Sequence, residues 1–142
     1  MKKNYQIYLA GGMSNLSIVE QFTWRNEIKN ELEEYECDYN VKCINPVDYY
    51  NTYDSTTYDS DLEVMNFDLH KVKKSDLIIM NFNNMNSLGS QSELAIAWDR
   101  GIPVIGLNES EQQLHPWQYC MTSKIFTNKE DMLQYIKDYY LD

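Results

Sequence analysis

Residues 76–107 decide the fold class of this chain, and they read DLIIMNFNNMNSLGSQSELAIAWDRGIPVIGL. DLIIMNF is a near-continuous apolar run, which is typical of a central strand covered on both faces. The spacing of Ser90 and Glu93 matches a capping box and predicts a helix over 91–100. Gly101 follows as the residue that ends this helix, and IPVIGL predicts a second buried strand. The stretch is therefore a strand–helix–strand unit.

The rest of the chain repeats this alternation. Strands are predicted at 5–10, at 41–45 and near Ile125, and helices at 17–35, from the capping box Ser60–Glu63 and from the N-cap Asn128. The alternation predicts a single α/β domain over residues 1–142, with a doubly wound parallel sheet of about five strands. With the strand order 2-1-3-4-5, ligands bind where the order reverses, between the first and third strands.

The composition excludes several classes of protein. The chain has 142 residues, 22 acidic against 12 basic side chains and a formal net charge of −10. Nucleic-acid binders hold phosphates through basic patches, and the sequence has none. A mean hydropathy of −0.60 and short apolar runs argue against a membrane protein, and we expect no signal peptide. Three cysteines without CxxC spacing suit a reducing compartment, so we expect a cytoplasmic location.

Glycine is scarce, so its positions are informative. Three of the five glycines lie in two loops, 11–13 and 87–90, that the expected strand order brings to the crevice. Neither GxGxxG nor GxxxxGK[ST] occurs, so the pattern does not identify a dinucleotide or phosphate loop. The glycine pair Gly11-Gly12 is equally consistent with a tight strand-to-helix turn. Glu93 lies just inside the helix after the second loop, either as a catalytic acid or as the partner of a cap.

Two other charged residues occupy unusual places in the predicted helices. Arg25 lies in the apolar stripe of the first helix, so its charge must reach solvent or find a partner. Asp68 borders the apolar stripe of the second helix, where polar side chains are usually solvated. That helix leads into the third strand and runs away from the strand ends, so Asp68 reaches the crevice only if the helix sits high or tilted.

Several fragments together resemble the nucleoside 2-deoxyribosyltransferase superfamily, which includes the transferases and the 2′-deoxynucleoside 5′-phosphate N-hydrolases. They are Tyr8-Leu-Ala-Gly-Gly-Met13, Trp24-Arg25, Asn45-Pro46, Asp68 with Ser75-Asp76-Leu-Ile-Ile, Gly89-x-x-x-Glu93-Leu-x-x-Ala97 and Gly101-Ile-Pro-Val. The resemblance runs from about residue 5 to residue 136. It implies a flavodoxin-like, Rossmann-like fold, a homodimer or higher homo-oligomer, and no metal or organic cofactor.

The resemblance also implies roles for individual residues. Glu93 matches the nucleophile that attacks the anomeric carbon, Asp68 the second carboxylate that assists departure of the base, and Tyr8 the tyrosine that orients the nucleophile. In retaining chemistry the two carboxyls lie about 5 Å apart. Substrate contacts are implied for Gly11, Gly12, Met13, Trp24, Arg25, Ser87 and Gly89.

Some positions depart from the family pattern. Asn83, Asn84 and Asn86 occupy the region where the transferases usually carry a further acid, and the loop after Gly89 has fewer glycines than that of the hydrolases. These departures concern base recognition and the phosphate cradle. His115 and the Tyr- and Asp-rich segment 48–61 are candidates to complete the site.

The leading hypothesis is therefore an enzyme for small-molecule deoxynucleosides, acting through a covalent deoxyribosyl-Glu93 intermediate and transferring the sugar to another base. The alternatives are a 2′-deoxynucleoside 5′-monophosphate N-hydrolase and a non-catalytic nucleotide-binding or sensing protein. Neither nucleic acid nor membrane is expected as a partner.

Overall fold

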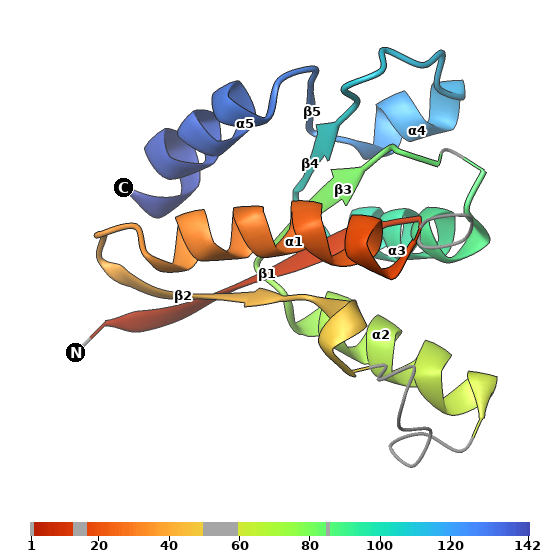
Figure 1. The fold of residues 1–142 in the computed structure, drawn as a ribbon, viewed down its shortest axis with the longest axis horizontal. Helices are drawn as coiled ribbons and strands as arrows, with labels where there is room; N and C mark the ends of the chain where they lie inside the picture. The colour runs from red at the N-terminus through yellow and green to blue at the C-terminus, as the bar shows by residue number, and fades with distance from the viewer. Residues whose placement is uncertain (1, 13–16, 50–59, 85) are drawn as a thin grey trace.

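The computed structural model describes residues 2–12, 17–49, 60–84 and 86–142. Within these residues five strands form one sheet in the order β2-β1-β3-β4-β5, and every neighbouring pair is parallel (Figure 1). The strands are β1 (Lys3–Gly11), β2 (Tyr39–Ile44), β3 (Leu77–Asn81), β4 (Val104–Leu107) and β5 (Lys124–Phe126). The predicted fold class and strand order are confirmed.

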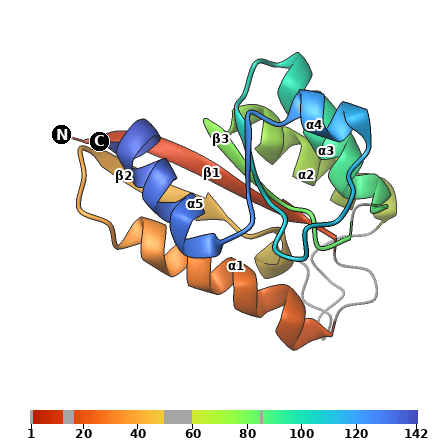
Figure 2. The ribbon, with the colours of Figure 1, turned by 90° about the horizontal axis from the view of Figure 1, so that it is seen from above.

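Helices cover both faces of the sheet. They are α1 (Ile18–Glu33), α2 (Asp61–Lys74), α3 (Leu88–Asp99), α4 (Pro116–Met121) and α5 (Lys129–Ile136), with the short 3-10 helix η1 (Pro46–Tyr49) and the π-helical segment η2 (Lys137–Leu141). Helices α1 and α5 lie on one face, and α2 and α3 lie on the other (Figure 2). None of the helices within the described residues combines the length and apolar character that a membrane crossing requires.

Side chains of β1 contribute to the hydrophobic cores on both faces of the sheet. Successive strand side chains point to opposite faces, so Ile7 and Leu9 pack with Ile28 of α1, while Tyr8 packs on the other side with Leu94 of α3. A tyrosine at this register is therefore carried to the face that α2 and α3 cover.

The start of α3 differs from the prediction. The helix begins at Leu88 with Ser87 as its N-cap, and the Ser87 side chain accepts a hydrogen bond from the backbone N–H of Ser90. The predicted cap at Ser90 is wrong by one turn. Glu93 consequently lies in the second turn and caps nothing, so the capping explanation for this acid is removed.

Other helix starts agree with the sequence. Ser17 forms a capping box with Glu20, and Ser60 and Asn128 are the N-caps of α2 and α5. The short helix α4 was not predicted, because its N-cap is His115, an uncommon capping residue.

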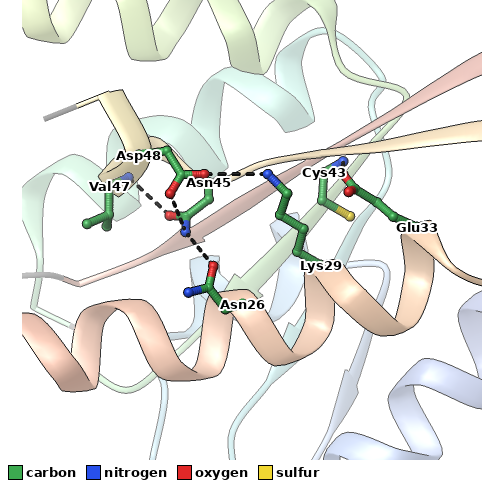
Figure 3. A network of polar contacts seen from close by, with 7 residues as sticks. All are labelled: Asn26, Lys29, Glu33, Cys43, Asn45, Val47 and Asp48. Carbon is green, nitrogen blue, oxygen red and sulfur yellow. Dashed lines mark hydrogen bonds and ion pairs between the residues drawn. The ribbon is translucent and has the colours of Figure 1, made fainter.

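Polar side chains anchor the end of β2 to α1 (Figure 3). The buried Asn45 donates from its amide to Asn26 Oδ1 at 3.4 Å, and its own Oδ1 accepts from the Val47 backbone at 3.1 Å. The outer-edge amide of Cys43 donates to Glu33 Oε2 at 2.8 Å. These contacts hold the last residues of β2 and the turn after them against α1. Strand β1 is longer and continues past this point.

Candidate active site

An open cavity of about 610 Å³ lies between α2 and α3 at the carboxyl end of β1. Gly11 of β1, Asp68 of α2, the N-cap Ser87, and Gly89 and Glu93 of α3 all line it. The structure therefore brings five of the predicted site residues to one cavity at the strand-order reversal.

Glu93 is a buried acid in the wall of this cavity, and its pKa is raised. Its side chain is buried, with 8% of the residue exposed, and burial raises the pKa of its carboxyl from 4.5 to about 7. A hydrogen bond from Tyr8 and the charge of Arg25 lower this pKa, whereas the charge of Asp68 raises it. Near neutral pH the carboxyl is therefore populated in both its ionised and its protonated form, which suits a group that attacks carbon or transfers a proton.

Tyr8 and Asp68 reach Glu93 from different elements. Tyr8 is entirely buried on β1 and interacts with the Glu93 carboxyl through its hydroxyl. Asp68 lies in the middle of α2, half-buried in the cavity wall, and its charge acts on Glu93. Because α2 packs along α3, its middle lies beside the first turns of α3 and not away from the strand ends.

The glycine pair at the end of β1, Gly11 and Gly12, has little space for side chains. A Cβ at Gly11 would lie 2.9 Å from Trp24 Cζ2, and one at Gly12 would lie 2.7 Å from Asn84 Cβ. The backbone of Gly12 is held on both sides by Asn83, whose Oδ1 accepts from the Gly12 N–H at 3.1 Å and whose Nδ2 donates to the Gly12 carbonyl at 3.3 Å. Sequence reasoning missed this role of Asn83. The signal was an amide placed directly after a buried strand.

Trp24 and Arg25 lie behind the cavity and not in its wall. Arg25 is fully buried, and its guanidinium donates from Nε to Leu9 O at 3.3 Å and from Nη2 to Gly11 O at 3.0 Å. Its guanidinium carbon lies 4.4 Å from the centre of the Trp24 ring. The backbone carbonyls of Leu9 and Gly11 are thus the partners that the position of Arg25 in the apolar stripe requires. Substrate contact by these two residues stays a prediction.

The remaining candidates lie elsewhere. Met13 and residues 50–59 of the 48–61 segment fall outside the described residues. His115 caps α4, with Nδ1 accepting from the Trp117 backbone at 3.1 Å, and lines a second cavity of about 630 Å³ away from Glu93. Completion of the site by these segments stays a prediction.

An apolar wall of the cavity was also missed. Met65 and Leu69 have the helical spacing of the apolar stripe of α2, and both line the cavity together with Val64 of α2 and Leu88 and Ile96 of α3. A largely apolar cavity with a few carboxylates and backbone groups suits a small ligand with an apolar face and a polar edge. Among the described residues there is no group of three His, Cys, Asp or Glu side chains that could hold a metal ion.

Gly12→Ala is expected to destabilise the protein by about 1–3 kcal/mol. The new methyl group would lie 2.7 Å from Asn84 Cβ, which is close to the backbone and cannot rotate away. Urea denaturation measures the effect. Gly89→Ala is the matched control for stability, because a Cβ at Gly89 meets nothing within 4 Å. Equal stability of the two variants would contradict the crowding at Gly12.

The family model described as nucleoside 2-deoxyribosyltransferase matches residues 7–134. No curated protein sequence matches the chain significantly.

Solved structures share the fold. The 2-deoxyribosyltransferase of Bacillus psychrosaccharolyticus has a TM-score of 0.72 at 17% identity, covering 92% of this chain and 91% of that one. The enzyme of Leishmania mexicana described as a 2-deoxyribosyltransferase has a TM-score of 0.71 at 15% identity, covering 96% and 99%. The CMP N-glycosidase BcmB of Clostridium botulinum has a TM-score of 0.56 at 18% identity, covering 94% and 98%.

Proposed function

Because the chain belongs to the nucleoside 2-deoxyribosyltransferase family, we propose that it cleaves the N-glycosidic bond of 2′-deoxynucleosides and transfers the deoxyribosyl group to another base. The observation that carries the proposal is Glu93, a buried carboxyl in the cavity wall with a pKa raised to about 7. A second carboxylate, Asp68, lines the same cavity, and the hydroxyl of Tyr8 on β1 interacts with the Glu93 carboxyl. Two carboxyls in different environments are what glycosidic cleavage uses.

In the first half-reaction the ionised Glu93 attacks the anomeric carbon. A bond forms between a Glu93 oxygen and C1′, the C1′–N bond breaks, and its electron pair goes to the base nitrogen. The transition state carries positive charge on the sugar, which the carboxylate stabilises. Asp68 assists departure of the base by delivering a proton, and Tyr8 holds the Glu93 carboxyl in position.

In the second half-reaction a nitrogen of the incoming base attacks C1′, the bond from C1′ to the Glu93 oxygen breaks, and Asp68 takes up the proton that this nitrogen loses. If water attacks instead, the product is free deoxyribose, which is the hydrolase outcome. The net charge of −10 favours a neutral nucleoside over a nucleotide substrate.

A second copy of the chain is expected beside the cavity mouth. Leu88 lines the Glu93 cavity and the neighbouring cavity and is 81% exposed, and Trp117 of the neighbouring cavity is 72% exposed. Exposed apolar side chains of this size are typical of an interface. Sedimentation equilibrium tests the proposal of a homodimer or higher homo-oligomer.

Product analysis tests the proposed reaction. The protein is incubated with a 2′-deoxynucleoside, with and without a second free base, and the products are separated by chromatography. Exchange of the base supports the transferase. Release of free base from the 5′-monophosphate alone would favour the N-hydrolase. Absence of both products from nucleosides and monophosphates would favour a binding protein.

Asp68→Asn is expected to lower kcat for base release by about 10²- to 10⁴-fold, the range that general acid catalysis contributes. The loss should be smaller for a substrate whose base leaves without protonation. Asp99→Asn, an exposed change at the far end of α3, is the control. Equal losses with both kinds of leaving group would contradict the proton-donor role.

A further inference from the structure

Strand β1 extends beyond the end of its neighbour β2, so the last residues of β1 form an unpaired edge on that side. Tyr8 of β1 pairs with Ile44, the last residue of β2, whereas Gly11 at the end of β1 still pairs with Asn81 of β3. The last three residues of β1 therefore have a neighbour on the β3 side and no strand on the β2 side.

The backbone direction shows which carbonyls this edge leaves without a strand partner. The Gln6 carbonyl accepts from the Asp76 N–H on the β3 side. Backbone groups alternate along a strand, so the carbonyls of Leu9 and Gly11 point to the β2 side. If the register continued, the donor to Leu9 O would be residue 46, which is Pro46 and has no N–H. An unmet buried carbonyl is costly, so another donor is required.

Arg25 supplies that donor. Its Nε donates to Leu9 O at 3.3 Å and its Nη2 to Gly11 O at 3.0 Å, and the side chain is fully buried. We propose that Arg25 is a positioning residue that replaces the missing strand along the end of β1, and so fixes the strand that presents Tyr8 and Gly11 to the catalytic cavity. The catalytic part of this inference rests on the proposed function.

The planar fork of arginine is what this position needs. Two carbonyls that are two residues apart on one strand are bridged by two N–H groups in a fixed geometry. The Trp24 ring, 4.4 Å from the guanidinium carbon, packs on the guanidinium face and holds its plane. A lysine would place one flexible ammonium there and could not reproduce the bridge.

The charge of Arg25 also acts on the cavity. The groups that act on the pKa of Glu93 are Tyr8 from β1, Arg25 from α1 and Asp68 from α2, and Arg25 is the cation among them. Burial lowers the pKa of Arg25 from 12.5 to about 10, and the groups Tyr8, Glu93 and Asp68 raise it, so Arg25 stays protonated at neutral pH. The same side chain thus holds the strand and favours the ionised form of Glu93.

The test compares Arg25→Met, Arg25→Lys and the control Arg100→Met. Arg100 is the other arginine of the chain and lies exposed at the C-cap of α3. Three quantities are measured: kcat and KM for base release, the titration of the Glu93 carboxyl by carbon-13 NMR, and hydrogen exchange of the Gly12 amide. The Glu93 signal is assigned by its loss in Glu93→Gln.

Arg25→Met should lower kcat at pH 7 by about tenfold or more with little change in KM, and should raise the Glu93 titration by about one unit. Exchange of the Gly12 amide should quicken by a similar factor, because the end of β1 is released. Arg25→Lys should keep the Glu93 titration near that of the wild type while Gly12 exchange still quickens. Arg100→Met should change none of these quantities.

Several results would overturn the inference. A folded Arg25→Met with unchanged Gly12 exchange and Glu93 titration would do so. A rise in KM with unchanged kcat would instead indicate substrate contact. If Arg25→Met does not fold, Arg25→Lys provides the test. An unchanged exchange rate of the Gly12 amide in Arg25→Lys would then show that the two hydrogen bonds from Arg25 do not hold the end of β1. If the wild-type protein turns over no deoxynucleoside or nucleotide, the proposed function fails, and the NMR and exchange measurements still decide the role of Arg25.

Discussion

Glu93→Gln is expected to lower kcat for base release from a 2′-deoxynucleoside by a factor on the order of a thousand or more. The amide fills the same space in the cavity wall, but it cannot attack the anomeric carbon or carry the negative charge that stabilises the oxocarbenium-like state. Base release is measured by chromatography under single-turnover conditions. KM should change little, because the side chain keeps its size.

The control and a second variant make this test specific. Asp99→Asn removes an exposed carboxylate at the other end of the same helix and should leave kcat unchanged. Glu93→Ala opens space beside the sugar, and a small carboxylate such as formate should restore part of the base release. Retention of more than about a tenth of the wild-type kcat by Glu93→Gln would contradict the nucleophile assignment, because loss of a nucleophile acts on the transition state directly.

The fold was predictable because its determinants are local. Strands β1, β3 and β4 contain short apolar runs that end at or next to Gly, Pro or Asn, and most helices begin at a Ser or Asn that caps them. The alternation of strands and helices predicts a parallel sheet, whereas the strand order 2-1-3-4-5 was an assumption that agrees with the flavodoxin-like fold implied by the family resemblance. The register of β1 against β2 was not predictable, because it depends on contacts between residues far apart in the chain.

The misplaced start of α3 shows where local chemistry becomes ambiguous. Ser87 and Ser90 have the same side chain and lie one turn apart, and only Ser90 is followed three residues later by a glutamate, Glu93, which made it the better capping-box match. Tertiary contacts select Ser87, because Asn83 and Asn84 shape the loop before it through Gly12 and the Asn86 amide. The same selection removes the cap role from Glu93 and leaves its carboxyl in the cavity wall.

The environment of the site was the least predictable part. The sequence pattern required a partner for Arg25, but the acceptors exist only because β2 stops before β1 and is followed by Pro46. Met65 and Leu69 had the spacing of core residues, yet they line the cavity beside Asp68. A stripe pattern shows which face of a helix is covered, but it does not show whether protein or a ligand covers each part of it.

Glu93 is also expected to make the folded protein less stable as the pH rises. Its pKa is about 7 in the folded state against an ordinary value of 4.5, so between these values the folded protein binds more protons than the unfolded chain. The free energy of unfolding then falls as the pH increases through this window. Above the window the total decrease stays constant, on the order of 3 kcal/mol. The direction follows from burial, the largest cause of the shift, because burial disfavours the charged carboxylate.

Glu93→Gln should remove this dependence. At pH 5 the variant and the wild type should differ little in the free energy of unfolding, whereas at pH 8 the variant should be more stable by on the order of 1–3 kcal/mol. Urea denaturation at the two pH values measures the difference, with Asp99→Asn as the exposed-acid control. A difference that is the same at both pH values, or a less stable variant at pH 8, would show that burial of Glu93 does not raise its pKa. A carboxylate that is unfavourable to bury is also one that gains by bonding to carbon, so greater stability with lost activity is the result that a buried nucleophile requires.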